Sequence, residues 1–168
     1  MSVSPTDLEI LREQLGRVPR GVVDIAARCA CGYPTVVMTA PRLDDGSPFP
    51  TTFYLTHPRA IYELSRLEAD GVMAELTELV ETHEDVAEAY QRAHEDYIAR
   101  RTALGEVPEI DGISAGGMPN RVKCLHALAG HSLAAGPGVN PIGDIALSRI
   151  DWTPETCTCG RENEKDAR

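Results

Sequence analysis

The segment TTFYLTHPRAIYELSRL, residues 51–67, contains the point at which the chain changes from strand to helix. Its first six residues are mostly β-branched or aromatic, which is typical of a strand. From Pro58 onward the apolar residues recur at helical spacing, at Ile61, Leu64 and Leu67. We therefore expect the strands to precede this segment and the helices to follow it.

Two further strands are expected before this segment, over residues 22–27 and 35–39, because both stretches are apolar and rich in β-branched residues. A turn that contains Cys29 and Cys31 separates them. Residues 7–17 have leucines at helical spacing and predict a short helix.

The second half of the chain is expected to be helical. Three helices follow Pro58, with breaks at Gly71 and at residues 82–83, and a glycine-rich loop covers residues 105–117. Another helix is expected to begin at Pro119, and a short terminal helix at Asn140. The predicted fold class is α+β: a small antiparallel sheet of about three strands, residues 20–57, packed on a helical bundle, residues 58–150.

Chain length predicts one domain. The chain has 168 residues, which suits a single domain over residues 7–153, with residues 1–6 and 160–168 as disordered tails.

Charge is concentrated in the helical half. The net charge is −10, and residues 61–111 contain fourteen acidic and four basic residues. We read this run as a solvated helical face. Such an acidic surface argues against nucleic acid and anionic membranes as partners. The chain has no apolar run long enough to span a bilayer and no signal segment, so we expect a cytoplasmic protein without membrane insertion.

The cysteines carry the clearest chemical signal. The chain has five cysteines, an odd number, and in a reducing compartment they are expected to be thiols or metal ligands. Thiolates beside imidazoles suit a tetrahedral zinc ion better than an iron–sulfur cluster, although the Cys-x-Cys spacing at Cys29 and at Cys157 is a weaker signal than Cys-x-x-Cys. Free thiols packed as small hydrophobic side chains are the alternative. The expected ligands are Cys29, Cys31, His57 and Cys124, with His126 as a substitute.

A second candidate site lies where glycines lead into the helix expected at Pro119. Backbone amides and the helix dipole favour an anion there, and Arg121 and Lys123 add positive charge. If the protein is an enzyme, His126 or His131 is expected to move the proton. Taken alone, His131 also fits a hydrogen-bonded core histidine.

Four blocks of the sequence resemble a bacterial family known as domain of unknown function 501, which is common in actinobacteria. The blocks are PRLDDGSPFPTTFYLTHP (residues 41–58), SRLE (65–68), GMPNRVKCLH (117–126) and GVNPIGD (138–144). The resemblance runs from about residue 8 to 152. It implies that the position of His57 is usually a cysteine, which supports His57 as a ligand. It weakens Cys157 and Cys159, which lie at or beyond its end.

Three functions are consistent with these residues. The first is a metal-stabilised binding or regulatory protein in which zinc joins the N-terminal sheet to a C-terminal helix. The second is a small hydrolase or transferase acting on a phosphorylated substrate. The third is an acidic protein-interaction module without a metal. A small anionic ligand or a protein is the expected partner.

Overall fold

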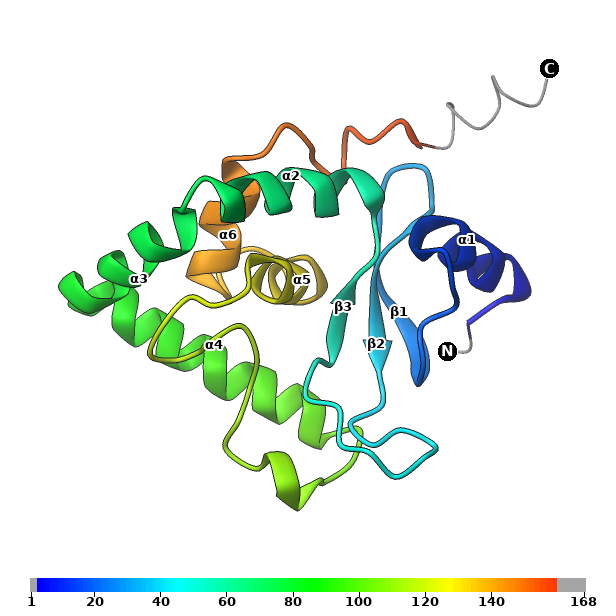
Figure 1. Ribbon diagram of the computed structural model, residues 1–168, viewed down its shortest axis with the longest axis horizontal. Coiled ribbons are helices and arrows are strands. Elements are labelled where there is room, and N and C mark those ends of the chain that lie inside the picture. Colours follow the sequence, from blue (N-terminus) through cyan, green and yellow to red (C-terminus); the bar gives the residue numbers. More distant parts are fainter. Residues whose placement is uncertain (1–2, 160–168) are drawn as a thin grey trace.

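Helices and strands follow one another in the order expected from the sequence. The structure is a computed structural model that describes residues 3–159 (Figure 1). Its elements are α1 (Pro5–Leu15), β1 (Val22–Arg28), β2 (Pro34–Thr39), β3 (Phe53–Leu55), α2 (Pro58–Ala69), α3 (Val72–Thr82), α4 (Glu84–Thr102), the 3₁₀ turn η1 (Pro108–Ile110), α5 (Leu125–Ala135) and α6 (Pro141–Ser148). The predicted α+β class is confirmed.

The sheet is small and antiparallel, with β2 in the centre of the order β1-β2-β3. Val36 pairs with Leu55 and Met38 with Phe53, so β3 lies along β2. Nearly every residue of β2 is buried, on both faces of the strand. Figure 1 shows the reason, because α5 lies on one side of the sheet and α1 on the other.

The first helix begins earlier than the sequence predicts. Residues 1–6 were expected to be a disordered tail, but α1 starts at Pro5. The Ser4 hydroxyl accepts a hydrogen bond from the Asp7 amide, and the Asp7 carboxylate accepts one from the Ser4 amide, which is a capping box. Asp7 also pairs with Arg28 of β1 at 2.7 Å. These contacts fix the start of α1 against the sheet. The tail expected over residues 160–168 lies outside the described residues.

Helix α5 occupies the centre of the fold. Figure 1 shows it between the sheet and helices α2, α4 and α6. Leu125 and Leu128 have no exposed surface. Gly130 faces β3 closely, because a Cβ atom at this position would lie 2.9 Å from the Phe53 carbonyl oxygen. The absence of a side chain at Gly130 therefore lets the helix backbone approach the strand.

The predicted breaks between α2, α3 and α4 are confirmed. Gly71 has a φ of 83° and precedes α3, and His83 is the extended residue between α3 and α4. The Tyr97 hydroxyl accepts a hydrogen bond from the Thr52 amide at 2.7 Å, which joins α4 to the start of β3. Within residues 3–159, none of the helices combines the length and the apolar character needed to cross a bilayer.

Candidate metal centre

A tight turn between β1 and β2 holds two of the expected ligands, Cys29 and Cys31. The Gly32 amide donates to the Cys29 carbonyl at 2.8 Å, and the Cys29 amide donates to the Tyr33 carbonyl at 3.0 Å. Gly32 has a φ of 82°, a left-handed conformation that glycine adopts without strain. The Cys-x-Cys sequence is therefore fixed at the end of the hairpin.

The segment that follows α6 returns to this turn. Figure 1 shows it passing above α2 toward the end of the hairpin. The Pro154 carbonyl accepts a hydrogen bond from the Ala30 amide at 2.7 Å, and the Cys31 thiol donates to the Cys157 carbonyl at 3.2 Å. These contacts bring Cys157 and Cys159 to the cysteines of the turn.

Four sulfur atoms meet at this place, and we refer to Cys29, Cys31, Cys157 and Cys159 as the four-cysteine group. All four sulfurs lie within 4.8 Å of one another. The Cys29 and Cys159 sulfurs are 3.6 Å apart, well beyond the disulfide bond length of about 2.05 Å. Four sulfurs arranged tetrahedrally at about 2.3 Å from a zinc ion stand about 3.8 Å apart. The spacing of the group therefore suits one tetrahedral ion.

Three of these thiols, those of Cys29, Cys157 and Cys159, differ in their tendency to ionise. Burial raises the pKa of Cys29 and of Cys159 above the ordinary thiol value. Burial also opposes ionisation of Cys157, but the Cys159 amide and the Trp152 indole outweigh it, so the pKa of Cys157 is lowered. A cation bound at the group would favour the thiolate form of the other sulfurs as well, because metals bind thiolates.

His57, another expected ligand, contacts the group through one cysteine. It is the residue before α2, and its side chain is 2% exposed. Its Nε2 lies 3.3 Å from the Cys157 sulfur, and its ring packs against Trp152 with 4.8 Å between centroids. The four atoms that lie mutually within 4.8 Å are all sulfurs, so His57 stands beside the group and orients Cys157.

A pocket of about 490 Å³ opens next to the four-cysteine group. His57, Arg59, Trp152 and Cys157 are among the residues that line it. The Arg59 guanidinium is half exposed and pairs with Glu63 at 3.0 Å. Any movement of the C-terminal segment would change the shape of this pocket.

Cys124 lies in a different group from Cys29 and Cys31. It is the residue before α5, and its sulfur gathers with the side chains of Glu68 and His126, all within 4.8 Å of one another. Glu68 belongs to α2, so the start of α5 meets this helix rather than the hairpin turn. The ligand set expected from the sequence is therefore divided between two places.

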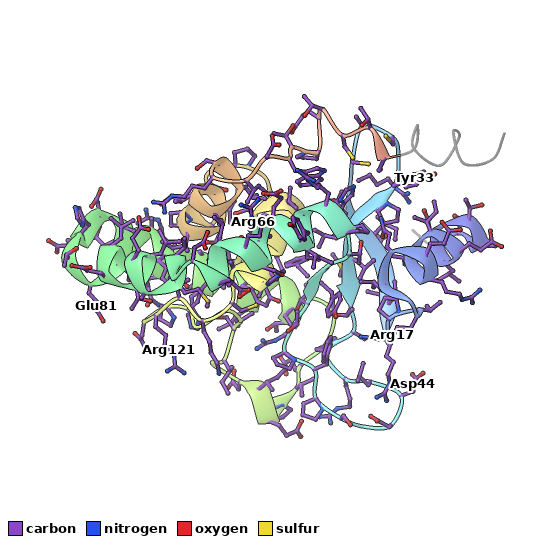
Figure 2. All side chains as sticks on the ribbon, turned by 45° about the horizontal axis from the view of Figure 1, so that its top comes forward. Arg17, Tyr33, Asp44, Arg66, Glu81 and Arg121 are labelled. Carbon is purple, nitrogen blue, oxygen red and sulfur yellow. The ribbon has the colours of Figure 1, made fainter. Side chains whose placement is uncertain are left out.

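The loop that carries Arg121 and Lys123 is not the helix start that the sequence predicts. Helix α5 begins at Leu125 instead of Pro119, and both cations are exposed on the loop before it. Figure 2 shows Arg121 and Tyr33, which adjoins the cysteine turn, at opposite ends of the molecule. The ligand set expected from the sequence, which joined Cys124 to Cys29 and Cys31, would have required these parts to lie together.

Most amides of this loop are occupied within the loop itself, and the Val122 amide donates to the Thr77 hydroxyl of α3 at 3.0 Å. Those of residues 120 and 121 donate to the Gly117 carbonyl, and those of residues 123 and 124 donate to the Gly116 carbonyl. An anion at this place would therefore interact with the side chains of Arg121 and Lys123 rather than with those amides.

His131 is a core residue whose ring nitrogens are both hydrogen-bonded. It has no exposed surface, and its ring stacks on Phe53 at an interplanar angle of 7°. The Asn140 side-chain amide donates to Nδ1 at 3.1 Å, so the proton resides on Nε2, which donates to Asp96 at 2.8 Å. In this arrangement His131 connects α4, α5 and α6 and presents no nitrogen to a substrate.

We expect His131 and His126 to titrate on opposite sides of the ordinary histidine pKa of 6.5. Burial lowers the pKa of His131, whereas Cys124 raises that of His126. As the pH falls below 6.5, His131 binds a proton in the unfolded chain but not yet in the folded protein. The free energy of unfolding therefore decreases as the pH falls through this range. His126 has the opposite sign, since its contribution is present below pH 6.5 and is lost as the pH rises through its folded pKa. Histidine NMR titrations measure both values, and a His131 pKa above 6.5 would contradict the prediction.

The fold and the four-cysteine group define the class: a small α+β protein in which the chain after the last helix meets a β-hairpin at a cluster of thiols. The family described as Protein of unknown function (DUF501) matches residues 25–148, and the chain belongs to this family. Neither the curated proteins nor the solved structures contain a match. The matched residues include Cys29 and Cys31 and end before Cys157 and Cys159.

Proposed function

We propose that the protein binds one zinc ion through Cys29, Cys31, Cys157 and Cys159 and acts as a metal-stabilised binding or regulatory protein. The observation that carries this proposal is the approach of four sulfurs to within 4.8 Å of one another from two distant parts of the chain. Four protein ligands with no open position are typical of structural zinc sites, which stabilise a fold rather than perform a reaction.

A single ion fits this spacing better than an iron–sulfur cluster. A cluster places several iron and sulfide atoms between its cysteine ligands, and this requires the cysteines to stand further apart. The contact of 3.6 Å between Cys29 and Cys159 leaves room for one ion. Zinc is favoured among single ions because it accepts four thiolates in tetrahedral geometry.

The proposed role of the ion is to hold the C-terminal segment on the hairpin. Two hydrogen bonds, from Ala30 to Pro154 and from Cys31 to Cys157, already join these parts. The same segment supplies Trp152 and Cys157 to the pocket of about 490 Å³. Zinc would therefore fix the shape of the pocket, whose polar lining residues His57 and Arg59 favour a small polar ligand.

A reducing compartment follows from this proposal, because the four ligands must remain thiolates rather than form disulfides. The raised pKa values of Cys29 and Cys159 favour the neutral thiol form of these two residues in the metal-free protein. We therefore propose the cytoplasm as the location of the protein.

Elemental analysis tests the proposal directly. We expect one zinc per chain in protein prepared without a polyhistidine tag, and almost none in Cys31→Ser, because three thiolates bind zinc much more weakly than four. Cys124→Ser, the same exchange at a cysteine outside the group, should keep its zinc. Iron together with visible absorption would indicate an iron–sulfur cluster instead of a single zinc ion and would contradict the proposal. Wild-type protein that binds no stoichiometric metal after reconstitution would overturn the proposal.

A further inference from the structure

Cys124, His126 and Glu68 form a second group of reactive side chains, separate from the four-cysteine group. Their sulfur, ring nitrogen and carboxylate oxygen all lie within 4.8 Å of one another. Cys124 and His126 lie at the start of α5, and Glu68 lies near the end of α2. The side chains of His126 and Glu68 are 27% and 20% exposed, and Cys124 is partly exposed, so a small molecule can reach them.

Hydrogen-bond geometry fixes the protonation of His126. Its Nε2 lies 3.2 Å from the Ile61 carbonyl oxygen and 3.1 Å from the Ser65 hydroxyl. That hydroxyl donates its one proton to the same carbonyl at 2.8 Å, so both oxygens accept from Nε2, and Nε2 carries a proton. Its Nδ1 lies 2.6 Å from Glu68 Oε1, and a carboxylate also only accepts, so Nδ1 carries a proton too. His126 is therefore an imidazolium cation held in place by α2. The pKa of His126 is raised, first by Cys124 and then, against burial, by Glu68.

Cys124 has the surroundings of a thiolate. It is the residue before the first turn of α5, where the helix dipole favours negative charge. Burial and, to a smaller extent, the negative charge of Glu68 oppose its ionisation, but His126 and the Ala127 amide outweigh them and lower the pKa of Cys124. Two positive sources, the imidazolium and the helix start, therefore favour the thiolate form.

A metal ion explains this group less well than a thiolate–imidazolium pair does. Two ligands of a tetrahedral zinc ion, each about 2.0–2.2 Å from it, stand about 3.4 Å apart. The contact of 2.6 Å between His126 and Glu68 is shorter than this and fits a charged hydrogen bond. The carboxylate thus orients the imidazolium, as the third residue of a nucleophilic group does.

We propose that Cys124 is a nucleophilic thiolate that forms mixed disulfides with low-molecular-weight disulfides, with His126 as its cationic partner and Glu68 as a positioning residue. The Cys124 sulfur attacks one sulfur of the small disulfide, and a new S–S bond forms as the old one breaks. The electron pair of the broken bond leaves on the released thiolate, which takes a proton from water. Cys124 is oxidised and the released sulfur is reduced.

The neutral probe 2-hydroxyethyl disulfide tests this inference on the zinc-loaded full chain, with the modified cysteine identified by mass spectrometry. We expect modification at Cys124, with a rate at pH 6.5 roughly 10-fold above that of an ordinary thiol of pKa about 8.5. The higher thiolate fraction of a low-pKa cysteine exceeds its loss of nucleophilicity at this pH. The rate should change little between pH 6.5 and 8.

Glu68→Gln should lower the pKa of His126 in an NMR titration, shift this pH profile upward and slow the reaction at pH 6.5, because an amide stabilises the imidazolium less than a carboxylate does. The substitution also removes the repulsion between Glu68 and the thiolate, but this effect is smaller than the contribution of His126. The matched control is Asp70→Asn, the same exchange at an exposed residue of the same helix end, which should leave the profile unchanged. A wild-type rate that rises tenfold per pH unit up to pH 8.5 overturns the proposal. So does stoichiometric zinc that protects Cys124, since that result would make the group a metal site. Site mapping separates this outcome from a failure of the four-cysteine group, which would appear as modification of Cys29 or Cys159.

Discussion

Cys159→Ser is expected to lower the free energy of unfolding by about 4 kcal/mol, the stabilisation that a ligand supplies at a free concentration about 1,000 times its Kd. Cys159 lies near the end of the described chain and is partly exposed. Without a bound metal, its substitution would change the free energy of unfolding by about 0.5 kcal/mol or less. A large loss of stability at such a position therefore indicates an ion that Cys159 binds together with the other three cysteines. Denaturant unfolding in a non-chelating reductant measures it.

Chelation separates the metal from the side chain. A chelator should lower the melting temperature of the wild type and of Cys124→Ser by roughly 8–16 °C, the equivalent of about 4 kcal/mol for a chain of this size. It should leave Cys159→Ser unchanged, because that variant has already lost the ion. A Cys159→Ser variant as stable as the wild type would show that no zinc ion stabilises the fold through the four-cysteine group.

Much of the fold could be predicted from the sequence because local patterns determine it. The change of period at Pro58, the breaks at Gly71 and His83, and the cysteine turn between two strands all depend on neighbouring residues. The start of α5 was wrong for the same reason. Pro119 is well suited to begin a helix, but the loop there closes on the Gly116 and Gly117 carbonyls, and the helix begins at Leu125.

The candidate site depends on contacts between distant residues, and only part of it could be predicted. Cys29 and Cys31 were expected ligands, and the structure brings them together with two cysteines that lie beyond the family match. The one signal for this pairing was the repeated Cys-x-Cys spacing at Cys157 and Cys159. Sequence cannot show that the chain after α6 turns back over α2, since Trp152 packing on His57 fixes that path.

The group around Cys124 also depends on a contact between distant residues that the sequence alone could not show. Its neighbour His126 was expected as a substitute metal ligand or as the residue that moves a proton, and Glu68 could not be named with them, because it lies on another helix. The structure supplies that residue, and it buries His131 in the core, which is one of the two roles that the sequence left open for it. Chemistry-bearing residues were thus identified by type, whereas their grouping required the fold.

Gly143→Ala is expected to destabilise the protein by about 3 kcal/mol, at the upper end of what an added core methyl group usually costs. Gly143 lies in the first turn of α6, where its amide donates to the Asn140 side chain at 3.0 Å. A Cβ atom there would overlap the Leu128 carbonyl oxygen and the Ser132 hydroxyl of α5. A carbonyl inside a helix cannot move aside as a flexible side chain can, so α6 would have to shift away from α5.

The sign of this effect distinguishes packing from helix propensity. Alanine is favoured over glycine within helices by up to about 1 kcal/mol, so propensity alone predicts that Gly143→Ala stabilises the protein. Gly16→Ala is the control, because a Cβ atom there meets nothing within 4 Å and only its left-handed φ of 74° is unfavourable, at about 1–2 kcal/mol. We expect Gly143→Ala to lower the melting temperature by roughly 6–12 °C and more than the control does. If the control were the less stable variant, the close contact at Gly143 would not hold α6 against α5. The position of α6, from which the chain continues to the four-cysteine group, would then depend on other contacts.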